Sequence, residues 1–92
     1  MNYELRIMKS LSYKKIKDLV ERHESNGDHI PFSICYACLN GAVVDIPDKE
    51  VICIGVDLRH RRRTIKHRVS GEIRTIHDCL ILRINDTNIV VK

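Results

Sequence analysis

The fold of this chain is decided by residues 32–46, which read FSICYACLNGAVVDI. Residues 32–39 are apolar on both faces of an extended segment, a pattern that indicates a central strand covered on both sides. Asn40-Gly41 then matches the two-residue type I′ hairpin signature, and residues 42–46 return with β-branched side chains. The stretch therefore predicts an antiparallel hairpin at the centre of a sheet.

Further strands are predicted on the C-terminal side of this hairpin, because apolar and polar residues alternate and turn residues separate the runs. Pro47–Glu50 has turn composition, and Gly55 in the following run indicates a bulge or bend. Ser70-Gly71 and Asn85–Asn88 mark two more turns, and His77-Asp78 interrupts the run between them. The expected strands are residues 32–39, 42–46, 51–58, 64–69, 72–76, 79–84 and 89–91.

One helix is predicted before the strands, over residues 13–25. Ser12 is a good N-cap, and Asn26-Gly27 supplies the left-handed residue expected just past a helix end. Residues 2–8 fit either a strand or a short helix, and both interpretations stay open. The helical side chains expected to pack against the sheet are Tyr13, Ile16, Leu19, Val20 and His23.

Ninety-two residues allow one small domain, residues 1–92, in which residues 30–92 form the β-rich region. Hydrophobic residues make up 43% and charged residues 30%, as in ordinary globular chains. The pattern predicts an α+β fold: an N-terminal helix followed by a strongly curved antiparallel sheet of five or six strands, closed into a partly open barrel that hides its edges. The order is similar to that of SH3-like and Sm-like small barrels, in architecture alone. An open meander with the helix across one face is the alternative.

Positive charge is concentrated in residues 59–68, RHRRRTIKHR, which hold six Lys and Arg and no acid. Since the whole chain carries only +4, the remainder is net acidic. Arg59–Arg63 are too crowded with like charge for a core, so we expect them in a solvent-exposed loop or strand end. A concentrated positive patch attracts polyanions. The predicted binding residues are Arg59, Arg61, Arg62, Arg63, Lys66, Arg68 and Arg74, with Arg83 as a neighbour on a paired strand.

Four cysteines raise the question of a metal or redox site. Cys35 and Cys38 have Cys-x-x-Cys spacing, but residues three apart in a strand face opposite sides and cannot share a zinc ion without a local turn. Cys53 and Cys79 lie in apolar runs, where a free cysteine commonly packs as a small buried hydrophobe. We expect buried structural cysteines, no metal and no cofactor. A zinc site or redox use of the Cys35–Cys38 pair is the alternative.

No catalytic arrangement is predicted. The segment His77-Asp78-Cys79 comes nearest to a nucleophile with a base, but in a strand Asp78 faces away from the other two. No Gly-rich phosphate loop or His-Glu-x-x-His motif occurs. No apolar run approaches the ~18 residues of a membrane span, and the opening residues lack the order of a secretory signal. We therefore expect a non-enzymatic protein of the cytoplasm.

Two stretches resemble small uncharacterised β-rich proteins carried by phages and mobile elements of gut bacteria. They are Ile30–Ile34, and Arg63–Lys66 through Ser70–Asn85. The resemblance implies a bacterial host cell, or a virion, as the setting. It gives no residue a role.

Together these features predict a small basic binding module that engages nucleic acid or another polyanionic surface through the Arg59–Arg68 hairpin. One Phe, three Tyr and no Trp argue against a stacking platform for single strands. The alternative is an accessory structural subunit of a larger assembly, such as a capsid decoration or packaging-associated protein. In that interpretation the same arginines contact an acidic protein surface, and terminal segments can pair with another copy to form a homo-oligomer.

Overall fold

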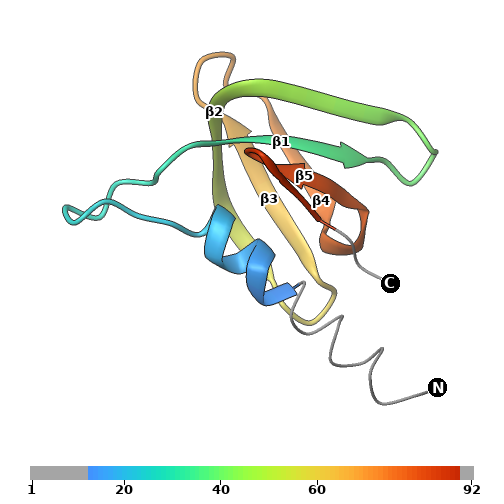
Figure 1. The fold of residues 1–92 in the computed structure, drawn as a ribbon, viewed down its shortest axis with the longest axis horizontal. Helices are drawn as coiled ribbons and strands as arrows, with labels where there is room; N and C mark the ends of the chain where they lie inside the picture. Colours follow the sequence, from blue (N-terminus) through green and yellow to red (C-terminus); the bar gives the residue numbers. More distant parts are fainter. Residues whose placement is uncertain (1–12, 90–92) are drawn as a thin grey trace.

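The computed structural model describes residues 13–89, in which six antiparallel strands form one sheet (Figure 1). The strands are β1 (Phe32–Ala37), β2 (Val43–Asp57), β3 (Arg62–His67), β4 (Ile73–His77), β5 (Ile81–Ile84) and β6 (Thr87–Asn88), and the 3₁₀ turn η1 (Asp78–Leu80) joins β4 to β5. Their order across the sheet is β4-β3-β2-β1-β5-β6. The α+β class with a six-stranded antiparallel sheet is confirmed. The expected barrel closure is not found, because β4 and β6 are the two edges of an open sheet.

The long strand β2 gives the sheet its bend. Its first half, through Ile46, pairs with β1, and its second half, from Val51, pairs with β3. The predicted turn at Pro47–Glu50 is wrong: these residues form an irregularity inside one continuous strand, where the register against β1 slips. Pro47 is tolerated in this strand because the hydrogen-bond pairing with β1 is interrupted there, so that no backbone N–H is required. The predicted bulge at Gly55 is confirmed by a register shift against β3 after Cys53.

The hairpin between β1 and β2 reverses where expected, but its turn is longer than predicted. The Gly41 N–H donates to the Cys38 carbonyl at 2.9 Å, and the Cys38 N–H donates to the Ala42 carbonyl at 2.7 Å. Gly41 has a φ of 90°, the left-handed region that glycine occupies without strain. Residues 39–41 therefore form a three-residue loop with a left-handed glycine at its end, and not a two-residue type I′ turn.

The later reversals also lie close to their predicted positions. The Gly71 N–H donates to the His67 carbonyl at 2.8 Å between β3 and β4. Asn85, with a φ of 53°, begins the turn into β6. Interruption of the chain after His77 is confirmed by η1. The last strand begins earlier than expected, because β6 is formed by Thr87 and Asn88 of the predicted turn. Of the expected strand 89–91, only Ile89 lies within the described residues.

A helix over residues 13–20 opens the described chain and lies across one face of the sheet (Figure 1). Its predicted apolar face is confirmed for four side chains, since Ile16 and Val20 are buried and Tyr13 and Leu19 pack against the core. The prediction is wrong for His23, which is exposed beyond the end of the helix. In the described part of the chain, no helix is long and apolar enough to cross a membrane.

The helix ends before the predicted residue 25, because the following segment forms a small antiparallel bridge of its own. The Ile30 N–H donates to the Arg22 carbonyl at 2.9 Å, and His23 pairs with His29. Gly27 has the expected positive φ, but it serves the turn of this bridge. The predicted N-cap Ser12 and the open question of residues 2–8 fall outside the described residues.

The hydrophobic core lies between this helix and the inner face of the bent sheet. Strands β1, β2, β3, β4 and β5 all contribute to it. The buried apolar side chains are Ile16, Val20, Phe32, Ile34, Tyr36, Val51, Cys53, Ile65, Ile76, Ile81, Ile84 and Ile89.

Candidate functional site

Arg63 does not belong to an exposed patch, because its side chain is only 2% exposed. Its Nε donates to Asp78 Oδ1 at 3.0 Å, and its Nη1 lies 3.0 Å from Glu21 Oε2. Paired residues of β3 and β4 share a face, so Arg63 lies beside Ile76 on the inner side of the sheet. The expectation that all of Arg59–Arg63 lie in solvent is therefore wrong at Arg63, since strand alternation places it inward and carboxylates from the helical region and η1 neutralise it there.

Burial acts on both members of this ion pair. Burial disfavours the charge of Arg63, but Asp78, Glu21 and Cys53 together outweigh that effect, and the pKa of Arg63 is raised. Burial also raises the pKa of Asp78, against the attraction of the Arg63 guanidinium. A buried pair of this kind makes each charge depend on the other.

Three more predicted binding arginines, and their neighbour Arg83, are held by carboxylates at the surface. The nearest approaches are Arg62–Asp57 (2.8 Å), Arg68–Glu50 (2.8 Å), Arg74–Glu72 (2.7 Å) and Arg83–Asp45 (2.7 Å). Asp57, Glu50 and Asp45 all lie on β2, and the sequence alone does not show that they are neighbours of these arginines. The pairing register of the strands would have shown it for Arg62, because Asp57 is its direct partner across the β2–β3 pair.

The Asp57 carboxylate makes a testable case. Hydrogen bonds from Arg62 and His60 lower the pKa of Asp57 from 3.8 to about 2. A group with a lowered folded pKa stabilises the protein above its unfolded pKa, and this contribution is lost as the pH falls toward 2. We expect an NMR titration of the Asp57 carboxyl to show a midpoint near 2.

Arg62→Gln should move that midpoint back toward 3.8, because the strongest hydrogen bond to the Asp57 carboxylate is lost. Arg68→Gln removes the same charge from a different ion pair and should leave the Asp57 midpoint in place. An unchanged midpoint in Arg62→Gln would contradict the assignment.

Arg59, Arg61 and Lys66 form no ion pair with a carboxylate of residues 13–89. Arg59 and Arg61 are exposed in the turn between β2 and β3. Lys66 lies on the opposite, outer face of β3, where it pairs across the sheet with Ile52. The structure thus divides the predicted patch: only Arg59 and Arg61 stay together.

Arg61 connects this turn to the helix. Its guanidinium carbon lies 4.5 Å from the centre of the Tyr13 ring, within the range of a cation–π contact. Arg61 has a φ of 52°, an uncommon conformation for a residue with a side chain. The contact brings a cation of the turn directly onto the helix.

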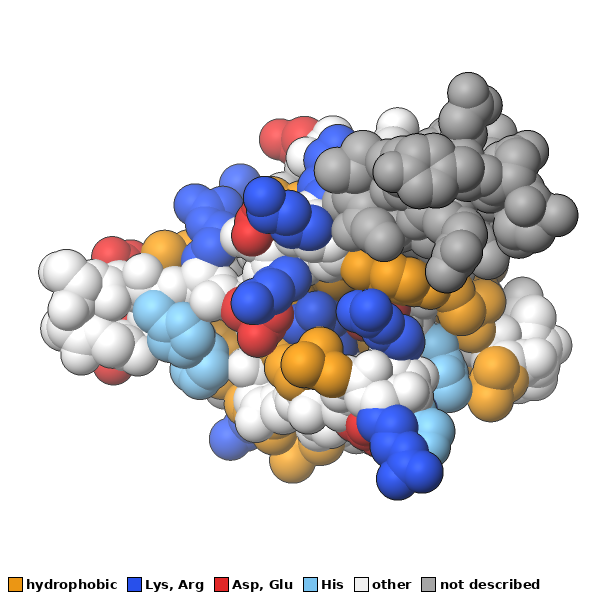
Figure 2. Space-filling model, turned by 90° about the horizontal axis from the view of Figure 1, so that it is seen from below, with side chains coloured by type: hydrophobic (Ala, Val, Ile, Leu, Met, Phe, Trp, Pro, Cys, Tyr) orange, Lys and Arg blue, Asp and Glu red, His pale blue; other side chains and the backbone are white. Residues whose placement is uncertain are grey.

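The helix adds exposed lysines to this side of the molecule, which the sequence-based prediction of the binding residues does not include. Tyr13, Lys17 and Glu21 are spaced by four residues and so follow one stripe of the helix. Because Tyr13 contacts Arg61 and Glu21 contacts Arg63, the intervening Lys17 lies beside the β2–β3 turn. Figure 2 shows Lys and Arg side chains gathered over this face, with a few carboxylates between them. We call the exposed residues Lys14, Lys17, Arg59 and Arg61 the helix–turn basic surface.

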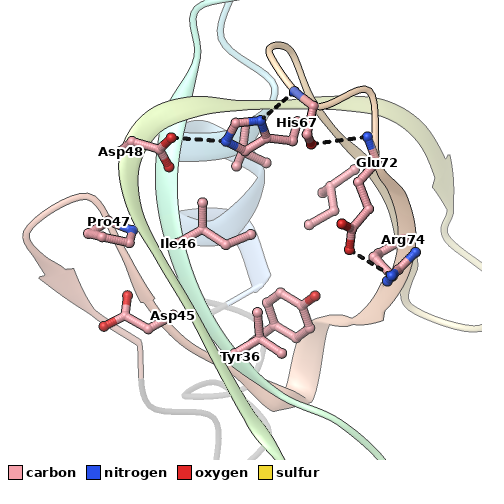
Figure 3. Close-up of a pocket in the computed structure, with 12 residues that line it drawn as sticks. Tyr36, Asp45, Ile46, Pro47, Asp48, His67, Glu72 and Arg74 are labelled. Atoms are coloured by element: carbon pink, nitrogen blue, oxygen red, sulfur yellow. Dashed lines mark hydrogen bonds and ion pairs between the residues drawn. The ribbon is translucent and has the colours of Figure 1, made fainter.

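A pocket of about 470 Å³ opens in the bend of the sheet (Figure 3). Its floor consists of Tyr36, Val44, Ile46, Val51 and Ile65. Ion pairs flank the opening, and they are His67–Asp48 (2.9 Å) and Arg74–Glu72 (2.7 Å). The pocket therefore combines an apolar floor with a charged rim.

His67 is held in one orientation at this rim. The Ser70 N–H donates to His67 Nδ1 at 3.1 Å, so in the neutral ring the proton lies on Nε2 and is donated to Asp48. Burial raises the pKa of the Tyr36 phenol at the other end of the pocket.

The four cysteines are free thiols. Cys53 is buried as expected, and its Sγ donates to the Gly55 carbonyl at 3.4 Å. Cys79 is exposed in η1, so the expectation of a buried residue is wrong there. Cys35 and Cys38 are half-buried. Within the described ranges no group of three potential ligands is placed to hold a metal ion.

Comparison with family models, with curated proteins and with solved structures gives no match to this chain.

Proposed function

We propose that this protein is a small non-enzymatic module that binds nucleic acid through the helix–turn basic surface. The observation that carries the proposal is the stacking of Arg61 on Tyr13 at 4.5 Å, which joins the cations of the β2–β3 turn to those of the helix. A cluster of exposed cations whose charge is not cancelled locally attracts a polyanion. This surface replaces the Arg59–Arg68 hairpin as the proposed site, because most arginines of that hairpin are already paired with carboxylates.

Phosphate groups are the chemical feature that this surface suits. Stacking on Tyr13 covers the plane of the Arg61 guanidinium and leaves its N–H edge free to donate to phosphate oxygens. Tyr13 is occupied by this contact and Tyr36 is buried, so neither ring is available to stack on a base. Binding should therefore depend on the backbone charge of the nucleic acid more than on its bases.

The architectural and biological setting forms part of the same proposal. An SH3-like or Sm-like arrangement, opened between β4 and β6, is supported by the helix-first order and by a long bent β2 that pairs with both neighbours. A phage or mobile-element origin, and hence the cytoplasm of a bacterial host, is supported by the resemblance of Ile30–Ile34 and of Arg63–Lys66 through Ser70–Asn85 alone.

A pair of matched variants tests the binding surface. Arg59→Gln with Arg61→Gln and Arg68→Gln with Arg83→Gln remove the same number of charges, but only the first pair comes from the basic surface. We expect the first double variant to bind a short labelled DNA duplex at least about tenfold more weakly at low salt, and its log–log salt slope to be shallower by about 2. Fluorescence anisotropy across a salt series measures both quantities.

The second double variant should keep the salt slope of the parent protein. Equal losses in the two variants would mean that net charge alone governs binding, and the proposed surface would be abandoned. Unchanged melting temperatures in both variants exclude unfolding as the cause.

The competing function is a structural subunit of a larger assembly. It is favoured by exposed apolar side chains at the ends of the sheet, such as Leu39 (81% exposed) and Val69 (78% exposed). If the duplex does not bind even at low salt, and sedimentation shows a multimer that persists at high salt, the assembly function is the better one.

A further inference from the structure

Residues 21–31 form an arm that projects away from the sheet between the helix and β1 (Figure 1). The arm reverses at Gly27, whose N–H donates to the Glu24 carbonyl at 2.9 Å. The Asn26 side chain accepts from the Asp28 N–H at 3.0 Å and donates to the Asp28 carboxylate at 3.1 Å. The arm is therefore an ordered hairpin, although none of its residues belongs to the hydrophobic core.

His23 and His29 face each other across this arm. The Glu24 N–H donates to the Asp28 carbonyl at 2.7 Å on one side of the pair, and the hydrogen bond from the Ile30 N–H closes the other side. The two histidines are thus a non-hydrogen-bonded pair, the arrangement in which side chains on neighbouring strands come closest and share one face. Their ring centroids lie 4.6 Å apart, with 41° between the ring planes.

The hydrogen bonds of the two rings leave one nitrogen lone pair on each. The Nδ1–H of His23 donates to the Glu21 carbonyl at 2.9 Å, so the neutral ring keeps its lone pair on Nε2. The Nδ1 of His29 is enclosed and has no hydrogen-bond partner among residues 13–89. Because an enclosed N–H without an acceptor is unfavourable, the proton of His29 belongs on Nε2 and the lone pair on Nδ1.

We propose that His23 and His29 together bind one divalent transition-metal ion of the class that imidazole prefers, represented by Zn²⁺. The two protein ligands are His23 Nε2 and His29 Nδ1, and water completes the coordination. Two imidazole rings bound to one zinc ion at about 2.0–2.1 Å and at a tetrahedral angle have centroids about 5 Å apart. The observed separation of 4.6 Å is close to this value, so the backbone of the arm already holds the two rings near the spacing that a shared ion needs.

The surroundings of the pair also suit a metal ion. His23 keeps its Nδ1–H on a backbone carbonyl, which is the outer hydrogen bond that metal-ligating histidines usually make. His29 Nδ1 gains the partner that it otherwise lacks. The exposed carboxylates of Glu24 and Asp28 lie on the same arm, against one exposed cation, Arg22, so the local charge favours a cation.

A zinc titration followed at the imidazole signals in NMR spectra tests the shared site. Added Zn²⁺ should shift the ring signals of His23 and His29 together, with one midpoint, and should leave those of the exposed His60 in place. Mg²⁺, which prefers oxygen ligands, should shift neither ring. A shift of only one of the two rings, an equal shift at His60, an equal effect of Mg²⁺, or no shift at millimolar Zn²⁺ would overturn the proposal.

Variants then show whether both histidines are ligands. His23→Gln and His29→Gln each remove one ligand and should weaken zinc binding at the remaining histidine at least about tenfold. His60→Gln removes an exposed histidine outside the arm, and Cys79→Ser removes an exposed thiol that can also bind zinc. Both control variants should keep the zinc midpoint of the parent protein. Full zinc binding in either arm variant, or its loss in either control, would contradict the shared site, and melting temperatures without zinc check that all four variants are folded.

The zinc site does not depend on the proposed nucleic-acid binding. Arg59→Gln with Arg61→Gln should lose duplex binding while keeping the full zinc shifts of both rings, and His23→Gln should keep the duplex affinity of the parent protein. Loss of the zinc shifts in the arginine double variant would show that the arm is not the site.

Discussion

Asp78→Ala is expected to lower the free energy of unfolding by about 3–5 kcal/mol, because it leaves the Arg63 guanidinium buried without its main partner. Both side chains are only 2% exposed and their nearest atoms are 3.0 Å apart. Water cannot replace the lost carboxylate at that depth, and Glu21, with 29% of its side chain exposed, remains as the second partner. Urea denaturation followed by circular dichroism measures the loss.

Asp45→Ala is the matched control for this variant. It breaks the Arg83–Asp45 pair, which is shorter (2.7 Å) but exposed, and should cost less than about 1 kcal/mol. If Asp78→Ala is as mild as Asp45→Ala, Arg63 is not buried as described. Replacing both partners, Arg63→Met with Asp78→Leu, should lose less stability than Asp78→Ala alone, since no unpaired charge stays in the core.

The two perturbed carboxylates act on stability with opposite signs. Asp57 has a lowered pKa, so its contribution is lost as the pH falls from 3.8 toward 2. Asp78 has a raised pKa, so the folded state binds its proton more readily and the contribution of Asp78 falls as the pH rises above 3.8. In the parent protein, Asp78 should therefore make the free energy of unfolding decline as the pH rises. The Asp78→Ala variant should lack this decline but keep the loss of stability at acid pH.

Sequence pattern predicted the elements better than the contacts between them. The β1–β2 hairpin, the Gly55 bulge and the buried face of Ile16 and Val20 all follow from local periodicity and turn chemistry. The continuous path of β2 through Pro47 does not, because it depends on the irregular pairing with β1, which is a property of the whole sheet.

The candidate site shows the same limit more strongly. The ten residues 59–68, with six Lys and Arg, form one basic segment in the sequence, yet strand alternation turns Arg63 inward and Lys66 to the outer face. The carboxylates that neutralise Arg62 and Arg68 lie on β2 and become neighbours only through the register of β2 with β3. Lys17 joins the surface only because Tyr13 and Glu21, on its own stripe of the helix, contact the turn and β3.

Phe32→Ala should produce a loss of similar size, about 3–5 kcal/mol, by opening a cavity in the core. Phe32 is 1% exposed on β1 and pairs with Val51, the point at which β2 passes from one neighbour to the other. Since small domains have a total stability of about 5–15 kcal/mol, the variant should have a much lower urea midpoint with a similar denaturant slope. Leu39→Ala, at an 81% exposed position, should change stability by less than about 0.5 kcal/mol.

Phe32→Ala also distinguishes the stability of the core from nucleic-acid binding by the helix–turn basic surface. The helix that carries Lys14 and Lys17 is held to the sheet by Ile16 and Val20, which share one core with Phe32. Phe32 itself lies in that core and outside the helix–turn basic surface, so folded Phe32→Ala should bind the DNA duplex with the affinity of the parent protein. Its binding should then disappear at the lower urea concentration at which it unfolds. Weaker binding by the fully folded variant would mean that packing in the core determines where the four cations lie. Binding would then require the helix to keep its position on the sheet.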